Sequence, residues 1–427
     1  MNKNILTVGG YDPTGGAGII ADIKTIKLLK CNPLSITTSI IPQNNNKVYS
    51  FYDLPKEQIE QQFKSIFDDF NIDIVKTGIL NNDTIELLLK YYKKYNFKII
   101  CDPVLKSSTN FDFINNELLD SYFKLFNKCY IITPNNEEYN FLKNYSKFKE
   151  FENKEVYTLI TGINDKLLFK GKEITTFKGK EIKNKNVHGT GCVFSSAISA
   201  FLNNDYDLNM AIKKAKEVVL GSVIYATKTK YGYNTNPVNI DYNSVIKNLN
   251  YSLYLLNKQQ NEFKYFIPEV GSNIAESILL PNNFKEVASL TGRIIRNKLG
   301  NIYIVGNIEF GASEHIAKII LAANKFNPKI RSCININYIG DEFIKLLEKN
   351  NNLTIGSFRR QDEPENVSSM EWGTTHCCEK LGFVPDIIYD KGDVGKEPMI
   401  RVLGENSIDV VNKVKIIMDI YMDGYLE

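Results

Sequence analysis

The sequence predicts an α/β protein made of two domains, and three observations lead to this prediction. The chain has 427 residues, which is more than a single domain usually holds. β-Rich runs alternate with stretches of helical spacing, as in a mostly parallel sheet covered by helices. A run of turn-forming residues at 231–241, YGYNTNPVNID, interrupts the alternation and predicts a linker. We therefore expect one domain over residues 1–237 and a second over residues 238–427.

The first domain is expected to begin with a strand that runs into glycine, ILTVGG at residues 5–10. In parallel sheets, ligands bind at the carboxyl ends of the strands. The segments GGYDPTGGAG, GIL, DPVL, TPNNEE and GTGC follow strand-like runs or lie in loops, so they are candidate functional loops. The other expected strands cover residues 35–41, 72–80, 97–105 and 129–135, and the expected helices cover 21–30, 59–70 and 84–95.

The second domain is expected to open with a long helix at about residues 242–260. A second α/β pattern follows, and it closes with a helix at 408–422. No internal repeat relates the two halves, so each is interpreted separately.

The composition excludes several classes of partner. There are 52 basic and 49 acidic residues, which is too balanced to favour nucleic acid. No apolar run is long enough to span a membrane. The seven cysteines are scattered and form no CxxC pattern, which favours a reducing cytoplasm. Small molecules are the expected partners.

A Gly-rich turn precedes an apolar stretch of small residues at GTGCVFSSA, residues 189–197. Gly189 and Gly191, with Thr190 between them, would leave backbone N–H groups bare at the first turn of a helix, and such a terminus attracts anions. Cys192 lies in the same turn, where the pKa of a thiol is lowered. It can then take a proton from a substrate hydroxyl. The alternative is an ordinary Gly-rich turn with a buried thiol.

Other features of the first half suit phosphoryl transfer from ATP, which needs charge stabilisation and alignment. Asp102 follows a hydrophobic strand and can hold Mg²⁺ directly or through water. Asn135 and Glu138 form an N-x-x-E unit that can organise metal and water. The glycines at 15, 16 and 18 let the backbone approach a small ligand. Each of these features, taken alone, is more often structural.

Together, GYDPTGGAGIIADIKT, PQN, KTGIL, DPVL, TPNNEE and NVHGTGC resemble the hydroxymethylpyrimidine (phosphate) kinases of the ribokinase superfamily. The resemblance covers about residues 1–235. It implies a ribokinase-like fold, a homo-oligomer, and two successive phosphorylations of 4-amino-5-hydroxymethyl-2-methylpyrimidine. It also implies site residues: Asp22 and Gln43 as pyrimidine readers, Ile79 and Val104 as apolar walls, Cys192 as base, and Gly189 to Cys192 as the anion hole.

Two positions depart from this family pattern. Ile79 stands where the family commonly has Met, which is a mild change. Thr161 stands where the family often has Lys, and the missing lysine is expected to lower ATP affinity or rate.

The second half contains candidate phosphate and metal residues. His315 lies near the start of an expected helix behind Ser313, a residue type that favours N-caps. Arg293, Arg331, Arg401 and Lys396 are candidate phosphate ligands, although a lone arginine is usually a surface or salt-bridge residue. Candidate metal carboxylates are Asp386, Asp390 and Glu397. His376 beside two cysteines lacks the spacing of a structural zinc site, so we interpret it as packed or solvated.

The order IPEVGSNI, GRI, FGASEHIA, RSCINI, SMEWG, PDIIYDKG and GKEPMIRVLG resembles the archaeal-type thiamine phosphate synthase domain found fused behind this kinase. The resemblance covers about residues 245–427. It implies coupling of the pyrimidine diphosphate with 4-methyl-5-(2-phosphooxyethyl)thiazole to give thiamine phosphate and pyrophosphate. We expect Arg293 to bind the diphosphate and His315 to bind a phosphate or leaving-group oxygen, with Lys396 as a further phosphate ligand.

Two alternatives stay open at this point. The second domain can sense thiamine phosphate without catalysing its formation, as related domains of transcription regulators do. The first domain can act on a pyridoxal-type vitamin, because those kinases share the Gly-rich turns. The cysteine of GTGC favours the pyrimidine kinase.

Overall fold

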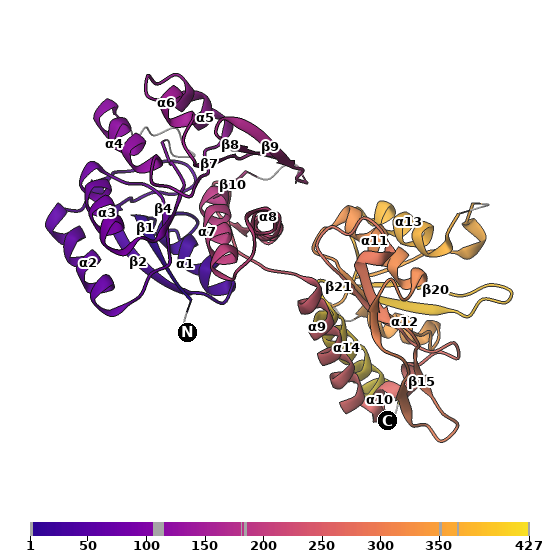
Figure 1. The fold of residues 1–427 in the computed structure, drawn as a ribbon. Coiled ribbons are helices and arrows are strands. Elements are labelled where there is room, and N and C mark those ends of the chain that lie inside the picture. Colours follow the sequence, from indigo (N-terminus) through magenta and orange to yellow (C-terminus); the bar gives the residue numbers. More distant parts are fainter. Residues whose placement is uncertain are drawn as a thin grey trace. The chain divides into compact units, whose positions relative to one another are not determined.

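The computed structural model describes residues 3–105, 115–180, 182, 186–349, 352–364 and 367–425. The chain divides into two compact units, Met1–Asn239 and Ile240–Glu427 (Figure 1). Each unit has its own sheet and its own cores. They are described separately below.

The first unit is built on a nine-stranded sheet in the order β3-β2-β1-β4-β5-β6-β7-β8-β9. The six strands from β2 to β7 are parallel, and β3, β8 and β9 are antiparallel to their neighbours. The strands are β1 (Asn4–Tyr11), β2 (Asn32–Ile40), β3 (Tyr52–Asp53), β4 (Ile74–Thr77), β5 (Lys98–Cys101), β6 (Ile131–Ile132), β7 (Tyr157–Ile160), β8 (Asp165–Phe169) and β9 (Lys172–Phe177).

Helices cover both faces of this sheet (Figure 1). One core lies under α2 to α6, and the opposite core lies under α1, α7 and α8. Amphipathic spacing explains why these segments fold as helices: Ile59, Phe63 and Phe67 recur every fourth residue in α2 and are buried. The helices are α1 (Gly18–Leu28), α2 (Lys56–Asp69), α3 (Asn82–Tyr95), α4 (Asn116–Phe126), α5 (Asn136–Lys143), α6 (Phe148–Glu152), α7 (Thr190–Asn203) and α8 (Leu208–Ile224).

A small second sheet of the first unit corrects one prediction. Residues 231–241 were expected to be only a linker, but Tyr233–Asn234 form β12, which pairs with β10 (Val187–His188) and β11 (Thr227–Lys228). Thr235 then donates a hydrogen bond from Oγ1 to the Gly16 carbonyl at 2.6 Å. The turn formers hid this pairing because strands of two residues carry no readable periodicity.

The second unit contains a seven-stranded sheet in the order β17-β14-β13-β18-β21-β20-β19. All its neighbouring strands are antiparallel except β19 and β20. A separate hairpin joins β15 to β16. The strands are β13 (Ile274–Ser277), β14 (Val287–Leu290), β15 (Ile294–Arg296), β16 (Ile302–Ile304), β17 (Ile308–Phe310), β18 (Ser332–Asn337), β19 (Ile355–Ser357), β20 (Ile387–Asp390) and β21 (Met399–Gly404).

Two helical layers enclose this second sheet. In the larger core, α9, α12 and α14 pack against one face of the sheet. In the smaller core, α11 and α13 pack against the other face. Figure 1 shows α9 and α14 side by side. The helices are α9 (Tyr242–Lys258), α10 (Gln260–Phe263), α11 (Glu314–Phe326), α12 (Asp341–Lys349), α13 (Ser369–Leu381) and α14 (Ser407–Tyr425), with single 3-10 turns at Lys264–Phe266, Phe284–Glu286 and Arg360–Asp362.

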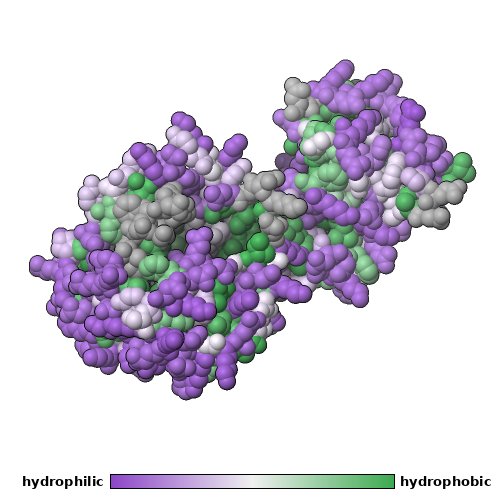
Figure 2. Space-filling view, turned by 90° about the horizontal axis from the view of Figure 1, so that it is seen from above, coloured by the Kyte–Doolittle hydropathy of each residue, from purple (hydrophilic) through white to green (hydrophobic). Residues whose placement is uncertain are grey.

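The face of the molecule drawn in Figure 2 is mainly polar. On the face drawn in Figure 2, hydrophilic residues dominate both units and hydrophobic ones form scattered patches. Across the described parts of the chain, none of the helices has the length and apolar character needed to span a membrane.

Candidate functional site

A pocket of about 810 Å³ opens at the carboxyl edge of the parallel strands in the first unit. Residues that follow β1, β2, β4, β5, β6 and β7 all reach it, because parallel strands end at the same edge. The pocket therefore brings together the residues predicted for the first domain: Asp22, Gln43, Ile79, Asp102, Val104, Asn135, Glu138, Gly189, Thr190, Gly191 and Cys192.

Close packing of two loops fixes the glycine turn at the start of α7. Gly189 occupies the N-cap with φ of +93°, a left-handed conformation that favours glycine. A Cβ there would lie 1.8 Å from the Gly16 carbonyl oxygen, so no side chain fits. Gly18 has φ of +60°, and its Cβ would lie 2.3 Å from the Gly10 carbonyl oxygen. These contacts hold the bare amides of α7 against the pocket.

The glycines at 15 and 16 need a different explanation from the predicted one. They were expected to let the backbone approach a ligand, but neither lines the pocket. A Cβ at Gly16 would come within 2.6 Å of the Asn234 side chain, and Gly15 has φ of +65°. Both are therefore required by chain packing and turn geometry.

A buried ion pair forms the floor of the pocket. Lys76 in β4 donates to both carboxylate oxygens of Asp22, at 2.8 and 2.9 Å, and neither side chain is more than 1% exposed. Asp22 also accepts hydrogen bonds from Thr7 at 2.6 Å and from Ser196 at 2.7 Å. A carboxylate has about four lone-pair sites, and these bonds occupy them. Asp22 therefore meets a ligand only by giving up a partner, which favours a positioning role over direct reading of the pyrimidine.

Two acidic side chains line the pocket, Asp102 from the loop after β5 and Glu138 from the first turn of α5. Burial raises the pKa of Asp102 above its usual range, against the pull of Lys76. Burial, joined by the charge of Asp102, raises the pKa of Glu138 to about 8. Asn135 and Glu138 also form a capping box at α5: each side chain accepts from the other's backbone N–H at 2.9 Å. The N-x-x-E unit is thus a helix cap that also lines the pocket.

The predicted thiolate character of Cys192 is wrong for the protein without ligands. Burial raises the pKa of the Cys192 thiol to about 12; Lys76 opposes this shift, and the charges of Asp22 and Asp102 add to it. Two carboxylates and desolvation thus outweigh the helix terminus. Cys192 is nevertheless half-buried, whereas the other six cysteines are buried.

The remaining predicted residues form the walls of the pocket. Gln43 follows β2, and its Nε2 lies 3.4 Å from Nε2 of His188. Ile79 and Val104 are both partly exposed to the pocket, as apolar walls require. Thr161 also lines the pocket, where it forms a backbone bridge with Asn135.

Sequence reasoning missed four charged or titratable residues of this pocket, and one of them, Glu137, lies in the first turn of α5. Lys76 stands inside the apolar run IDIVKTGIL, and a lysine within a buried strand was the available signal. Asp12 and His188 lie beside one another, with 3.5 Å between Asp12 Oδ2 and His188 Nε2. Although burial acts in the opposite direction, hydrogen bonds from His188 and Thr14 lower the pKa of Asp12.

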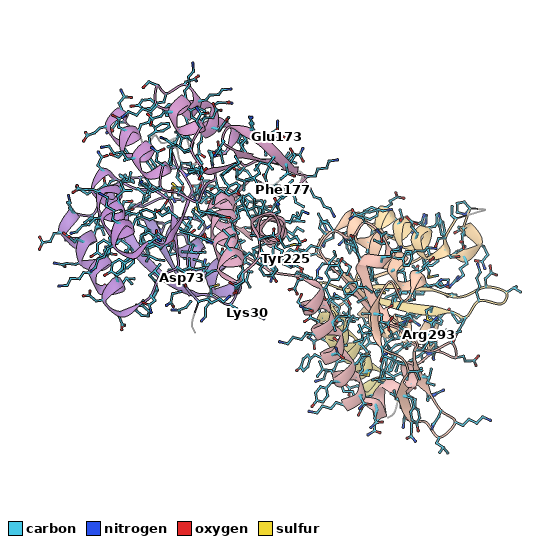
Figure 3. All side chains as sticks on the ribbon, in the orientation of Figure 1. Lys30, Asp73, Glu173, Phe177, Tyr225 and Arg293 are labelled. Atoms are coloured by element: carbon cyan, nitrogen blue, oxygen red, sulfur yellow. The ribbon has the colours of Figure 1, made fainter. Side chains whose placement is uncertain are left out.

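The second unit does not bring its two main candidates together. β14 and β17 are antiparallel, with Leu290 opposite Ile308 and Ala288 opposite Phe310. Arg293 follows Leu290 and His315 follows Phe310, so they leave the sheet at opposite ends of this strand pair. Figure 3 labels Arg293 beside the β15–β16 hairpin. His315 is exposed, and the Ser313 hydroxyl does not cap α11 as predicted.

Two predicted phosphate ligands of the second unit are buried and already paired. Arg331 donates to the Ser277 carbonyl at 2.5 Å and to Glu276 at 3.4 Å. Arg401 pairs with Asp390 at 2.7 Å, and Arg360 also binds this carboxylate at 2.5 Å. Neither Arg331 nor Arg401 therefore faces a ligand. Lys396 is exposed, with Nζ 3.8 Å from a Glu363 oxygen.

The three carboxylates predicted to supply a metal ligand do not gather either. Asp386 is held by Lys413 and Thr354, Asp390 by the two arginines, and Glu397 accepts from the backbone N–H of Glu269 at 2.9 Å. No cluster of three or more metal-ligating side chains occurs among the described residues. His376 stacks on Trp372 with 5.0 Å between ring centroids, consistent with a packed histidine.

Comparison with known proteins assigns each unit to a family. Residues 12–239 match the family described as phosphomethylpyrimidine kinase, and residues 248–416 match thiamine-phosphate synthase ThiN. The second match favours a synthase over a sensor, and the first favours the pyrimidine over a pyridoxal-type substrate.

Two curated relatives agree with this assignment. The bifunctional thiamine biosynthesis protein ThiDN of Methanocaldococcus jannaschii is 57% identical over 418 residues, which cover 98% of this chain and 99% of the relative. The hydroxymethylpyrimidine/phosphomethylpyrimidine kinase of Aquifex aeolicus is 34% identical over 53% of this chain and 97% of its own length. Among solved structures, a pyridoxal kinase of Bacillus subtilis in an ADP complex is 26% identical, with a TM-score of 0.49, over 55% of this chain and 97% of its own.

The order of the two units is the same as the order of the two matched families, and the bifunctional relative aligns along nearly the whole chain. The chain therefore belongs to the family of bifunctional thiamine biosynthesis enzymes, in which a phosphomethylpyrimidine kinase is joined to a thiamine-phosphate synthase.

Proposed function

We propose that the first unit phosphorylates 4-amino-5-hydroxymethyl-2-methylpyrimidine twice with ATP, and that the second unit couples the diphosphate to thiazole phosphate. The kinase part of this proposal rests on one pocket, in which the N-terminus of a helix, two acidic side chains and a cysteine lie together. The synthase part of the proposal rests on the family match over residues 248–416.

Phosphoryl transfer in this pocket would use α7 as the anion site. The amides at Gly189 to Cys192 face the pocket, and backbone N–H groups at a helix start attract phosphate oxygens. Gln43, Ile79 and Val104 would hold the pyrimidine across from them. Cys192, in its thiolate form, would accept the proton of the hydroxymethyl group as the hydroxymethyl oxygen attacks the γ-phosphorus.

The donor set of the pocket fits Mg²⁺. Asp102 and Glu138 lie close enough for the charge of Asp102 to raise the pKa of Glu138, and a divalent cation would supply the compensating charge. We propose that these two side chains, with Asn135 beside them, would hold Mg²⁺ directly or through water. The ion would neutralise charge on the phosphates. Thr161 offers no cation for this purpose, so more of the neutralisation would have to come from an ion held by Asp102 and Glu138.

In the second unit, the separation of Arg293 and His315 favours two different anionic groups. Arg293 would bind the leaving diphosphate, where cationic groups stabilise departing charge. His315, at the first turn of α11, would contact the thiazole phosphate. Lys396 would add a further phosphate contact.

We also propose a compartment, an oligomeric state and partners for the enzyme. All seven cysteines are free thiols, which supports a reducing, cytoplasmic compartment. Family resemblance supports a homo-oligomer. Small-molecule substrates are its partners.

The test is a reconstitution with the full chain. The chain is mixed with ATP, Mg²⁺, hydroxymethylpyrimidine and thiazole phosphate, and thiamine phosphate and pyrophosphate are expected to form. Pyridoxal in place of the pyrimidine is expected to be phosphorylated much more slowly. Accumulation of the diphosphate without thiamine phosphate would contradict the synthase half, and preference for pyridoxal would contradict the kinase half.

A further inference from the structure

Lys76 is a fully buried lysine that the phosphoryl-transfer proposal leaves without a role. Its side chain has no exposed area, yet it lines the pocket. Burying an ion pair is weak as a means of stabilisation, because desolvation costs about as much as the attraction returns. Replacing such a pair by apolar residues of similar volume is often neutral for stability. The position of this charge therefore calls for another reason.

The geometry of α7 directs Cys192 at this ion pair. Ser196 donates to Asp22 Oδ1 at 2.7 Å, so this face of α7 contacts the pair. Residues four apart share one face of a helix, and Cys192 stands four residues before Ser196. The thiol therefore faces the same floor.

Charged groups reach Cys192 from several elements. They are Lys76 from β4, Asp22 from α1, Asp102 after β5 and the backbone N–H of Gly18. Lys76 is the cation of this set, and its charge acts against burial and against both carboxylates. Negative charge on the sulfur, or on an oxygen beside it, is thus stabilised mainly by this ammonium.

A glycine is the residue next to the ammonium on the same strand end. Gly78 lies two residues after Lys76 in the chain, and a Cβ at Gly78 would stand 3.6 Å from Lys76 Nζ, in ordinary van der Waals contact. Both residues line the pocket, and Gly78 adds no side chain beside the ammonium there.

We propose that Lys76 stabilises the negative charge that develops at the reacting end of the kinase pocket, on the Cys192 sulfur and on the hydroxymethyl oxygen. Asp22 is then a positioning residue that holds the ammonium in place. The part that concerns the oxygen rests on the proposed kinase function. In that step the proton passes from the hydroxyl to the Cys192 thiolate, which becomes a thiol; the oxygen bonds to the γ-phosphorus, and the bond between the γ-phosphorus and the ADP oxygen breaks.

The test measures the reactivity of Cys192 in the full chain. Alkylation by iodoacetamide between pH 7 and 9 is followed by mass spectrometry, and it reports Cys192 because the other six cysteines are buried. The rate follows the thiolate fraction. Lys76→Met is expected to slow alkylation about tenfold, the effect of one pKa unit. Asp22→Asn is expected to accelerate it several-fold, because a negative neighbour is removed.

The double variant Lys76→Met/Asp22→Asn is the matched control for folding, since it leaves no unpaired charge in the core. Its alkylation rate is expected between those of Lys76→Met and the wild type. If Lys76→Met does not fold, Asp22→Asn and the double variant decide the outcome. Rates that stay at the wild-type value, or that shift in the same direction in both single variants, would overturn the proposal. Failure of Cys192 as the kinase base would instead leave phosphorylation intact in Cys192→Ala, without changing the alkylation contrast.

Discussion

The two units of this enzyme differ in how far their candidate residues converge. In the first unit, residues from six loops meet in one pocket. In the second, Arg293 and His315 leave the sheet at opposite ends of β14 and β17, and two other predicted phosphate ligands are locked in buried ion pairs. The sequence motifs of both halves were equally suggestive, so the difference comes from the sheets.

Strand direction explains this contrast. Successive parallel strands return the chain to the same edge, so motifs after β1, β2, β4 and β5 share a site whatever their distance in sequence. Antiparallel neighbours send consecutive loops to opposite ends. A motif list therefore predicts a shared site in the first unit and does not predict one in the second.

A large effect on coupling is expected from the variant that tests whether Arg293 and His315 act on separate groups. Arg293→Ala is expected to slow coupling about 10²–10³-fold, as the loss of a group that stabilises leaving charge does. Kinase activity should stay within about twofold of the wild type. Coupling is measured with the pyrimidine diphosphate supplied directly.

The double variant Arg293→Ala/His315→Ala sharpens this test. Residues that contact different groups lose activity independently, so the two fold-losses are expected to multiply. A double variant no slower than Arg293→Ala alone would mean that both residues contact the same group. It would contradict the conclusion that the candidate residues of the second unit do not converge on one site.

The next effect concerns the loop packing that builds the kinase pocket. Gly189→Ala is expected to lower the free energy of unfolding of the first unit by about 2–5 kcal/mol, from backbone strain and the collision with the Gly16 carbonyl. Gly382→Ala in the second unit is the matched control. It also has positive φ, at +76°, but nothing lies within 4 Å of its Cβ, so only about 1–2 kcal/mol is expected.

Urea unfolding of the full chain measures both variants, with the transition of the affected unit followed in each case. Equal losses in the two variants would mean that the crossing of the two loops contributes nothing beyond strain.

The smallest effect is the pH dependence caused by Glu138. Its pKa is about 8 in the folded protein and near 4.5 when unfolded, so the folded state holds the proton more tightly. Stability from this group is complete below pH 4.5 and is lost as the pH rises through 8. Glu138→Gln is expected to remove this loss, which is on the order of 2 kcal/mol for a partly exposed group.

Thermal unfolding at pH 5, 7 and 9 measures this difference, and Glu137→Gln changes the same charge one residue away as a control. An identical pH dependence in the wild type and in Glu138→Gln would show that Glu138 titrates normally in the folded protein.

The sequence predicted the regular elements of the first unit well because their patterns are local. The spacing of Ile59, Phe63 and Phe67 predicts α2. The apolar runs before Asp102 and Asn135 predict β5 and β6. Long-range effects escaped it. The pKa of Cys192 depends on Asp22 and Asp102, which are distant in sequence, and Gly16 is required by Asn234, which lies in a stretch predicted to be a linker.

The same limit applies to charged residues. Lys76 and Arg401 lie in strands and Arg331 directly precedes one, so the three look alike in sequence. Lys76 nevertheless lines a pocket, whereas the two arginines are buried in the core. Only the partner on the neighbouring strand or helix distinguishes them. In the second unit, the antiparallel order of the strands was not readable from the alternation of helix and strand.

The most direct test of two separate active sites is Cys192→Ala, with both half-reactions measured on one preparation. Phosphorylation of the pyrimidine is expected to fall about 10²–10⁴-fold, the usual contribution of a general base. Coupling from supplied diphosphate should be unchanged, because Cys192 belongs to the first unit alone. Equal loss of both reactions in a folded variant, or full retention of phosphorylation, would contradict this division of labour.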